Sequence, residues 1–209
     1  MKESSMKVTS IKQQLNRANR YAIFLEGEYA FSLSGTALLD SKLTLGQEVT
    51  DQQIEELKAR AAADALYDQT LRYLALRQRT AWEIKTYLTR KGASPPLADN
   101  ILNKLSNVGL VDDAKFTEAY INDHQLLRPT SRRKLILELR KKHVTDEVIQ
   151  RVMRGDEEHE PNDEQTALQA IIARKRKQPR YQDDLQLMQY LARQGFNYSD
   201  IKSALQNST

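Results

Sequence analysis

The chain has 209 residues, of which 40% are hydrophobic and 29% are charged, with a formal net charge of +4 and no cysteine. This composition supports a buried core of one or two domains, and the lack of cysteine excludes disulfides and thiolate-bound metals. The apolar runs fall far short of the roughly 20 residues that cross a bilayer, and the first residues, MKESSMK, lack the apolar core of a secretory signal. We therefore expect a soluble cytoplasmic protein with no membrane partner.

A β-hairpin is predicted near the N-terminus. Residues 21–25 and 29–33 alternate large apolar side chains with smaller ones, and the dipeptide Glu26-Gly27 separates the two runs. Glycine accepts the positive φ angle that two-residue hairpin turns require, so a turn that ends in glycine is a strong hairpin signal.

Two further signals frame this hairpin. Residues 8–11 can begin another strand, and residues 43–49 can add a short edge strand. Thr50 and Gln53 have the spacing of a capping box, in which the hydroxyl and the amide each satisfy a free backbone N–H at the start of a helix. Residues 1–58 are therefore expected to form a β-hairpin module and the start of a linking helix.

From residue 54 onward the apolar spacing is helical, and one pattern occurs in residues 80–92, 131–143 and 183–195. Each copy has two apolar residues four positions apart on one helix face, followed by a residue that ends the helix. The apolar pairs are Ile84/Leu88, Leu135/Leu139 and Leu187/Leu191, and the helix stops are Gly92, His143 and Gly195. A period of about 50 residues is typical of repeat proteins, in which each unit covers the open face of its neighbour.

Each repeat is predicted to hold three short helices, which depend on packing for their stability. They are expected near residues 61–76, 81–91 and 97–107, then from 112, at 132–142 and 146–153, and from 163 onward. The expected fold class is mainly α, an elongated tandem array of three three-helix repeats with a small N-terminal β-hairpin module. The predicted boundaries are 1–58 for the module, 59–109, 110–155 and 163–209 for the repeats, and 156–162 for an acidic linker.

The charge is unevenly distributed along the chain. Six basic residues and a single acidic one, Glu138, lie between residues 130 and 142; the basic ones are Arg132, Arg133, Lys134, Arg140, Lys141 and Lys142. At about 100° per residue, side chains seven positions apart share a helix face, so a basic stripe is expected opposite the apolar pair. Such a stripe can contact phosphates, or an acidic protein surface, without reading sequence. The alternative, a solvated face that stabilises the helix dipole, is the weaker reading because so little acid dilutes the stripe.

A second basic group ends a later helix and consists of Arg174, Lys175, Arg176 and Lys177. Cations at a helix end contribute about 0.3–1 kcal/mol each to its stability, and four in a row exceed that need. Helix termination and polyanion binding fit this group equally well, and we include it among the candidate binding residues.

Catalytic chemistry has little support in the sequence. Asp112 and Asp113 point about 100° apart and stand where a helix start favours negative charge, so we interpret them as a helix cap and not as a metal or acid–base pair. The histidines His124, His143 and His159 are scattered. No phosphate-binding glycine loop, nucleophile elbow or zinc motif occurs. We predict no catalytic residue, no cofactor and no metal.

The only tryptophan, Trp82, has two possible roles. It stands two residues before Ile84, on the flank of the apolar stripe of its helix. Stacking on a nucleobase is one role for such a ring, and packing within the core or between repeats is the favoured interpretation.

Three segments in order resemble the RecX family of regulatory proteins. They are L-A-L-R-Q-R-T-x-x-E-I-x-x-Y-L-x-x-K-G in residues 74–92, L-x-x-x-G-L-V-D-D-x-x-F-x-x-x-Y in residues 105–120, and S-x-x-x-L-x-x-E-L-x-x-K in residues 131–142. The hairpin at residues 21–31 resembles an extension found in some members. The chain departs from the family pattern at His143, where glycine is usual, and in the acidic stretch after Arg154.

The resemblance implies a non-enzymatic modulator of the bacterial recombinase RecA, with roles in recombination, DNA repair and the SOS response. The family consists of tandem three-helix units that lie in the groove of the RecA–single-stranded-DNA filament and mostly inhibit its activities. It implies RecA and its filament as partners, contacts with the phosphate backbone of single- or double-stranded DNA, and a monomeric state. The basic residues named above are then the expected filament- and DNA-binding residues.

Two other functions fit short helices of this kind. A helix-turn-helix-like DNA-binding regulator requires a recognition helix rich in Arg, Asn or Gln that reads bases, and the third helix of each repeat is weakly equipped for that. A protein-interaction adaptor without nucleic-acid binding predicts no salt-dependent affinity for DNA.

Overall fold

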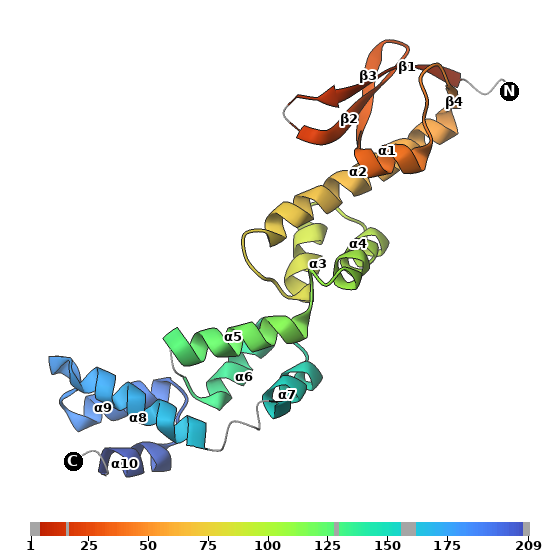
Figure 1. Ribbon diagram of the computed structural model, residues 1–209. Helices are drawn as coiled ribbons and strands as arrows, with labels where there is room; N and C mark the ends of the chain where they lie inside the picture. The colour runs from red at the N-terminus through yellow and green to blue at the C-terminus, as the bar shows by residue number, and fades with distance from the viewer. Residues whose placement is uncertain (1–4, 16, 128–129, 156–161, 207–209) are drawn as a thin grey trace. The chain divides into compact units, whose positions relative to one another are not determined.

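The computed structural model describes residues 5–15, 17–127, 130–155 and 162–206. Within those ranges the chain forms one four-stranded antiparallel sheet near its N-terminus and ten α-helices (Figure 1). The mainly α fold with a small N-terminal β-structure is therefore confirmed. The chain packs as two compact units, the first comprising Met1–Arg77 and Ile84–Leu105 and the second comprising Gln78–Glu83 and Ser106–Thr209.

The predicted hairpin is present and belongs to a larger sheet. The strands are β1 (Ser5–Gln14), β2 (Arg17–Leu25), β3 (Glu28–Ser34) and β4 (Glu48–Thr50), in the order β3-β2-β1-β4. Glu26 and Gly27 form the β2–β3 turn with φ angles of 47° and 87°, the two positive values that a type I′ turn requires. The expected edge strand at 43–49 is shorter than predicted, because only Glu48–Thr50 pairs with β1.

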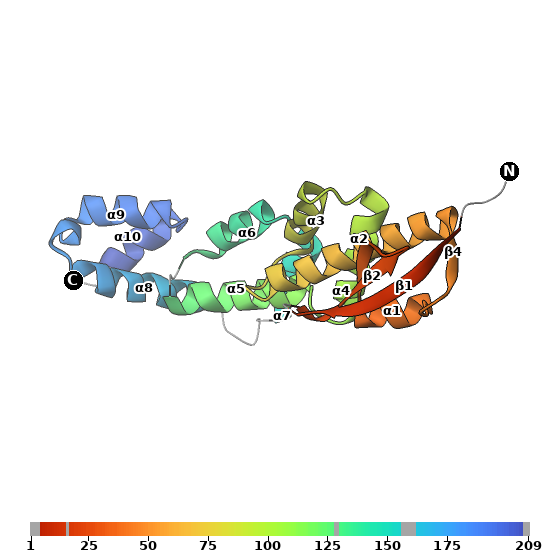
Figure 2. The ribbon, with the colours of Figure 1, turned by 90° about the horizontal axis from the view of Figure 1, so that it is seen from above.

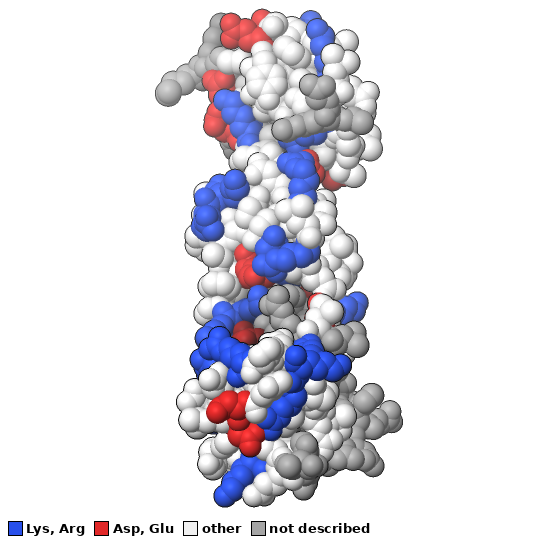
Figure 3. Space-filling view, turned by 90° about the vertical axis from the view of Figure 1, so that its left-hand side faces the viewer, with Lys and Arg blue, Asp and Glu red and all other residues white. Residues whose placement is uncertain are grey.

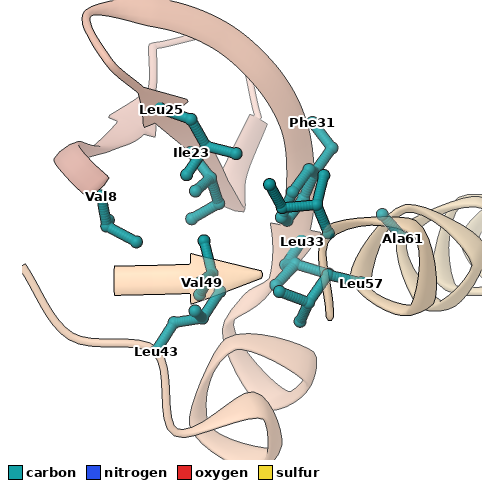
Figure 4. Packing of buried hydrophobic residues seen from close by; sticks show 10 residues of the cluster. Val8, Ile23, Leu25, Phe31, Leu33, Leu43, Val49, Leu57 and Ala61 are labelled. Atoms are coloured by element: carbon teal, nitrogen blue, oxygen red, sulfur yellow. The ribbon is translucent and has the colours of Figure 1, made fainter. Parts of the chain in front are cut away.

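Two helices pack against this sheet. Helix α1 (Gly35–Ser41) was not expected; the Ser34 hydroxyl caps it by accepting from the Ala37 N–H. Helix α2 (Asp51–Leu74) begins at the predicted Thr50–Gln53 capping box, ten residues before the expected helix at 61–76. Its first three turns contribute Ile54, Leu57 and Ala61 to a core whose other members come mainly from the sheet (Figure 4).

A buried ion pair fastens the hairpin to α2. Arg20 on β2 has a side chain that is only 7% exposed. Its Nη1 lies 2.7 Å from Asp68 Oδ2 and 3.3 Å from Asp64 Oδ2, and its Nη2 donates to the Ser32 carbonyl at 2.8 Å. Asp64 also accepts from the Ser34 N–H and hydroxyl at 2.7 and 2.8 Å. Both lone-pair sets of Asp64 and most of the guanidinium donors are therefore satisfied inside the first unit.

The remaining helices follow the predicted periodicity. In chain order they are α3 (Ala81–Arg90), α4 (Pro95–Asn107), α5 (Asp113–Leu127), α6 (Arg132–Lys141), α7 (Asp146–Gly155), α8 (Asn162–Arg176), α9 (Asp184–Arg193) and α10 (Tyr198–Gln206). Helices α8, α9 and α10 lie side by side (Figure 2). They share one apolar cluster, and α5, α6 and α7 contribute to another. Residues 156–161 of the predicted acidic linker lie outside the described residues, and Asn162 begins α8. The five-part division stays a prediction.

The same helix stop occurs in all three copies of the sequence pattern. Gly92, His143 and Gly195 have φ angles of 86°, 58° and 91°. The next residue donates its N–H to the carbonyl five positions earlier, at 3.0 Å for Ala93 to Leu88, 3.2 Å for Val144 to Leu139 and 3.4 Å for Phe196 to Leu191. These are the bonds of a Schellman motif, followed by a buried apolar residue. His143 thus adopts a left-handed conformation that normally favours glycine.

One kind of contact joins successive copies of the pattern inside the second unit. The hydroxyl of Thr80, which caps one copy, donates to the carbonyl of Lys142 at 3.0 Å. In the same way the N–H of Ser131, the next cap, donates to the carbonyl of Gln194 at 3.2 Å. A capped helix start therefore meets a helix end, which pairs the positive and negative ends of two helix dipoles. We call these two contacts the Thr80 junction and the Ser131 junction.

Side chains reinforce both junctions at equivalent positions. At the Thr80 junction Glu83 Oε1 lies 3.9 Å from Lys142 Nζ, and Trp82 stacks on His143 with ring centroids 3.9 Å apart. At the Ser131 junction Lys134, the equivalent of Glu83, donates through Nζ to Gln194 Oε1 at 2.9 Å. Trp82 is thus held in packing between repeats, as favoured from the sequence, with 43% of it exposed.

Alanine at Gly195 should destabilise the protein more than alanine at Gly92. Both residues have positive φ, so each alanine costs about 1 kcal/mol in the backbone. A Cβ on Gly195 would also overlap the Ser131 hydroxyl, whereas a Cβ on Gly92 meets nothing within 4 Å. We expect losses of about 3 and about 1 kcal/mol in the free energy of unfolding, measured by urea denaturation followed by circular dichroism. Equal losses would show that the Ser131 junction is open in solution.

Candidate functional site

The predicted basic stripe lies on α6 with the expected orientation. Leu135 and Leu139 are buried, and Ser131 caps the helix by accepting from the Lys134 N–H at 3.2 Å. Arg132, Arg133 and Lys141 are exposed, and no ion pair joins them to any residue that the structure describes. These three cations are therefore available to an external anion.

The other three basic residues of α6 are engaged within the protein. Lys134 and Lys142 take part in the two junctions, and the Lys142 ammonium also lies 5.6 Å from the ring centroid of Phe116. Arg140 binds Asp146 through Nε at 2.7 Å and Nη2 at 3.1 Å. The hydrogen bond from Arg140 lowers the pKa of the Asp146 carboxyl. The structure thus divides the predicted six into two groups of three.

The second basic group is divided in the same manner. Arg176 donates to the carbonyl of Gln182 at 2.7 Å and to the Asp184 carboxylate. The Lys175 ammonium lies 4.6 Å from the centroid of the Tyr190 ring and also faces another tyrosine. Arg174 and Lys177 are exposed, without an ion pair to the described part of the chain.

Five exposed cations remain after this sorting, and we call them the free basic set: Arg132, Arg133, Lys141, Arg174 and Lys177. Figure 3 shows several groups of Lys and Arg along this face, with the densest in the lower half of the view beside a smaller patch of Asp and Glu. Arg193 was missed by the sequence analysis; it is exposed, and its carbonyl lies 3.4 Å from Lys134 Nζ on α6. It is the only basic residue of α9, so no run of like charge marks it in the sequence.

The adjacent acids Asp112 and Asp113 accept from two different helices. Asp112 Oδ1 accepts from the N–H groups of Ala114 and Lys115 at 2.9 and 3.1 Å, so it caps α5 as predicted. Asp113 Oδ1 instead accepts from the Ala81 N–H at 2.8 Å, at the start of α3. Burial, opposed by this hydrogen bond, raises the pKa of Asp113.

Replacing Asp113 by asparagine should preserve or increase stability at neutral pH. Because the pKa of Asp113 is higher in the folded protein, its contribution is greatest below the unfolded value and declines as pH rises through the folded one. Asparagine keeps the acceptor for Ala81 and removes the buried charge. Urea midpoints measured from pH 3 to 7 should therefore flatten for Asp113→Asn, whereas Asp113→Ala should lose stability throughout. A neutral-pH loss with asparagine as large as with alanine would contradict this account.

Tyr120, His124 and Glu138 form a polar cluster on α5 and α6. Tyr120 donates its hydroxyl to Glu138 Oε2 at 2.8 Å, and His124 Nε2 lies 3.6 Å from the same atom. Burial and the hydrogen bond to Glu138 raise the pKa of Tyr120. Across the described ranges, no three His, Cys, Asp or Glu side chains are grouped as metal ligands. Nor do those ranges contain a helix that is both long and apolar enough to span a membrane.

Comparison with known proteins places the chain in a family. The RecX N-terminal domain matches residues 6–50, and the first and second RecX three-helix domains match residues 67–105 and 112–153. The regulatory protein RecX of Listeria monocytogenes is 30% identical over 206 residues, which cover 98% of this chain and 76% of the relative. The Bacillus pumilus protein of the same name is 28% identical, over 96% of this chain and 77% of the relative.

Two crystal structures share the fold. A structure of regulatory protein RecX has a TM-score of 0.74 at 23% identity, and the match covers 96% of this chain and 99% of that one. RecX from Lactobacillus salivarius has a TM-score of 0.59 at 19% identity, over 70% of this chain and 96% of that one. From the domain matches and the Listeria relative together, this chain belongs to the RecX family of regulatory proteins.

Proposed function

We propose that this protein is a non-enzymatic, cytoplasmic regulator that binds the RecA–single-stranded-DNA filament and inhibits its activities. Family membership, with relatives named as regulatory proteins, is the observation that carries the proposal. The free basic set adds a physical reason, because exposed cations without internal partners attract a polyanion. RecA and its filament are the partners in this proposal, and the protein acts as a monomer in dilute solution.

The proposed mechanism is stoichiometric binding and not turnover. Cations of the free basic set contact DNA phosphates or acidic residues of RecA, which gives affinity without base readout. A bound molecule then hinders strand exchange and filament growth and slows ATP hydrolysis by RecA. Recombination, DNA repair and the SOS response are the processes that such inhibition would adjust.

The direct test is RecA ATPase activity on single-stranded DNA with this protein titrated into the reaction. The rate should fall and saturate as the protein approaches a fixed ratio to RecA. A control reaction with a DNA-independent ATPase should not change. An unchanged RecA rate at saturating protein, with no filament binding by sedimentation, would contradict the proposal.

The two alternatives predict different binding data. A helix-turn-helix-like regulator would prefer particular duplex sites over random duplex, through α4, α7 or α10. An adaptor would bind protein partners with no salt-dependent affinity for DNA. Phosphate contacts with a single strand instead give a log–log salt slope of about −0.7 for each contact, so a salt titration with single-stranded DNA separates these cases.

A further inference from the structure

We propose that two copies of this protein associate head to tail, with the start of α9 in one copy docked on the end of α3 in the next. The docking contact is the one that already joins successive copies of the sequence pattern inside the chain. The inference is independent of the proposed function, since it concerns the protein alone.

The internal junctions define what such a contact needs. One side is a capped helix start, Thr80 or Ser131, and both residues are fully buried. The other side is a helix end that ends in a Schellman motif, as at Gln194 and Gly195. The fit is close: a Cβ added to Gly195 would overlap Ser131 and lie 3.0 Å from the Lys134 Cβ.

One helix start and one helix end of the same kind have no such partner among the described residues. Gly92 ends α3 with the same motif, yet it is exposed and a Cβ there meets nothing within 4 Å. Asp183 caps α9 by accepting from the Gln186 N–H at 2.9 Å, yet it too is exposed, unlike the two internal caps. The first copy of the pattern therefore has an unpartnered helix end at Gly92, and the third copy has an unpartnered helix start at Asp183. We call these the open helix end and the open helix start.

The two open halves have complementary charge. Arg90 and Lys91, both exposed, flank the open helix end, and the exposed Asp183 stands at the open helix start, where the neighbouring Asp184 is already paired with Arg176. Opposite charges favour this pairing and disfavour like-with-like contacts between two α3 ends or two α9 starts.

The side chains that reinforce the internal junctions also have counterparts at the open ends. In the repeated pattern, Gln186 on α9 is equivalent to Glu83 and Lys134. Lys91 is equivalent to Lys142 and Gln194. A Lys91–Gln186 hydrogen bond would reverse the donor and acceptor of the Lys134–Gln194 pair. Leu185, at the position of Trp82, is 64% exposed, and docking would cover this apolar side chain.

Such a contact has two consequences. It joins different surfaces of the two copies, so it can add further copies in series. A contact between two helix ends buries much less than the roughly 1,000 Å² of a stable interface, so association should be weak in free solution. It becomes effective where copies are already held side by side, because tethering raises their effective concentration.

Single cysteines can test the geometry, because the chain has none of its own. We would prepare full-length Lys91→Cys and Gln186→Cys variants, confirm their helical content, and treat them with a short bismaleimide, separately and mixed. Cross-linked dimer should form in the mixture several-fold above either variant alone. A Glu55→Cys variant, with its cysteine at an exposed site on α2, mixed with Gln186→Cys gives the background.

Two outcomes would overturn the proposal. Dimer in the mixture at or below the Glu55→Cys background would show that the open ends do not meet. Equal dimer within each single variant would indicate a two-fold contact in place of a head-to-tail one. Adding Arg90→Glu to the Lys91→Cys variant places a carboxylate opposite Asp183, so it should lower the yield several-fold, and an unchanged yield would refute this orientation.

Discussion

Reversing the three exposed cations of α6, by Arg132→Glu, Arg133→Glu and Lys141→Glu together, should remove most of the affinity for the RecA filament. Exposed charge contacts contribute up to about 1 kcal/mol each, and each new carboxylate adds a similar repulsion, so the affinity should fall by about 100-fold or more. If the three side chains contact single-stranded DNA, the log–log salt slope should become shallower by about 2. Filament binding and RecA ATPase inhibition, measured at several salt concentrations, check both expectations.

The control for this variant changes net charge by the same amount elsewhere. Arg60, Arg72 and Lys104 are exposed on the first unit, and their reversal to Glu should leave binding nearly intact. Arg140 is left out of the test variant because it binds Asp146, so its reversal would place two carboxylates together and disturb the α6–α7 connection. Full inhibition by the test variant would remove the basic face of α6 from the proposed mechanism.

The largest effect on stability is expected from Arg20→Ala. The substitution leaves the Asp64 and Asp68 carboxylates without their cation at a site where the arginine side chain is 7% exposed. Breaking a buried pair in this way costs about 3–5 kcal/mol. Urea denaturation should show this loss, and hydrogen exchange should rise in the sheet and α2 while α8–α10 keep their protection.

Arg60→Ala is the matched control for the Arg20 substitution. Arg60 is an exposed arginine of α2, and its loss should change the free energy of unfolding by less than about 0.5 kcal/mol. If Arg20→Ala lowered the free energy of unfolding as little as Arg60→Ala, the ion pair would stabilise the fold no more than hydration of the same charged groups does.

Local signals in the sequence were sufficient for most helices and for the hairpin. The Glu26-Gly27 turn, the Thr50–Gln53 capping box and the apolar pairs all depend on interactions between residues close in sequence. Each therefore predicts its local structure without knowledge of the rest of the fold. Helix α1 was missed because its seven residues carry no apolar stripe long enough to show a period. The capping box correctly predicted where α2 begins, but the sequence did not show that this helix runs without a break into the one expected at 61–76.

Contacts between distant residues could not be predicted in this way. Nothing near Arg20 in the sequence indicates that it meets Asp64 and Asp68, because pairing at such separation depends on how the sheet meets α2. For the same reason the basic stripe was predicted as a unit. In the folded protein Arg140 binds Asp146 and Lys134 binds Gln194. The tertiary structure is therefore needed to tell which cations are available to a partner.

The stacking of Trp82 on His143 has a practical consequence. The chain has a single tryptophan, and this one rests against an imidazole ring with centroids 3.9 Å apart. An indole in that setting emits differently from one surrounded by water, so the fluorescence of the native protein reports whether Trp82 is stacked on His143. Fluorescence lifetimes recorded as RecA is added can follow the Thr80 junction without any attached dye.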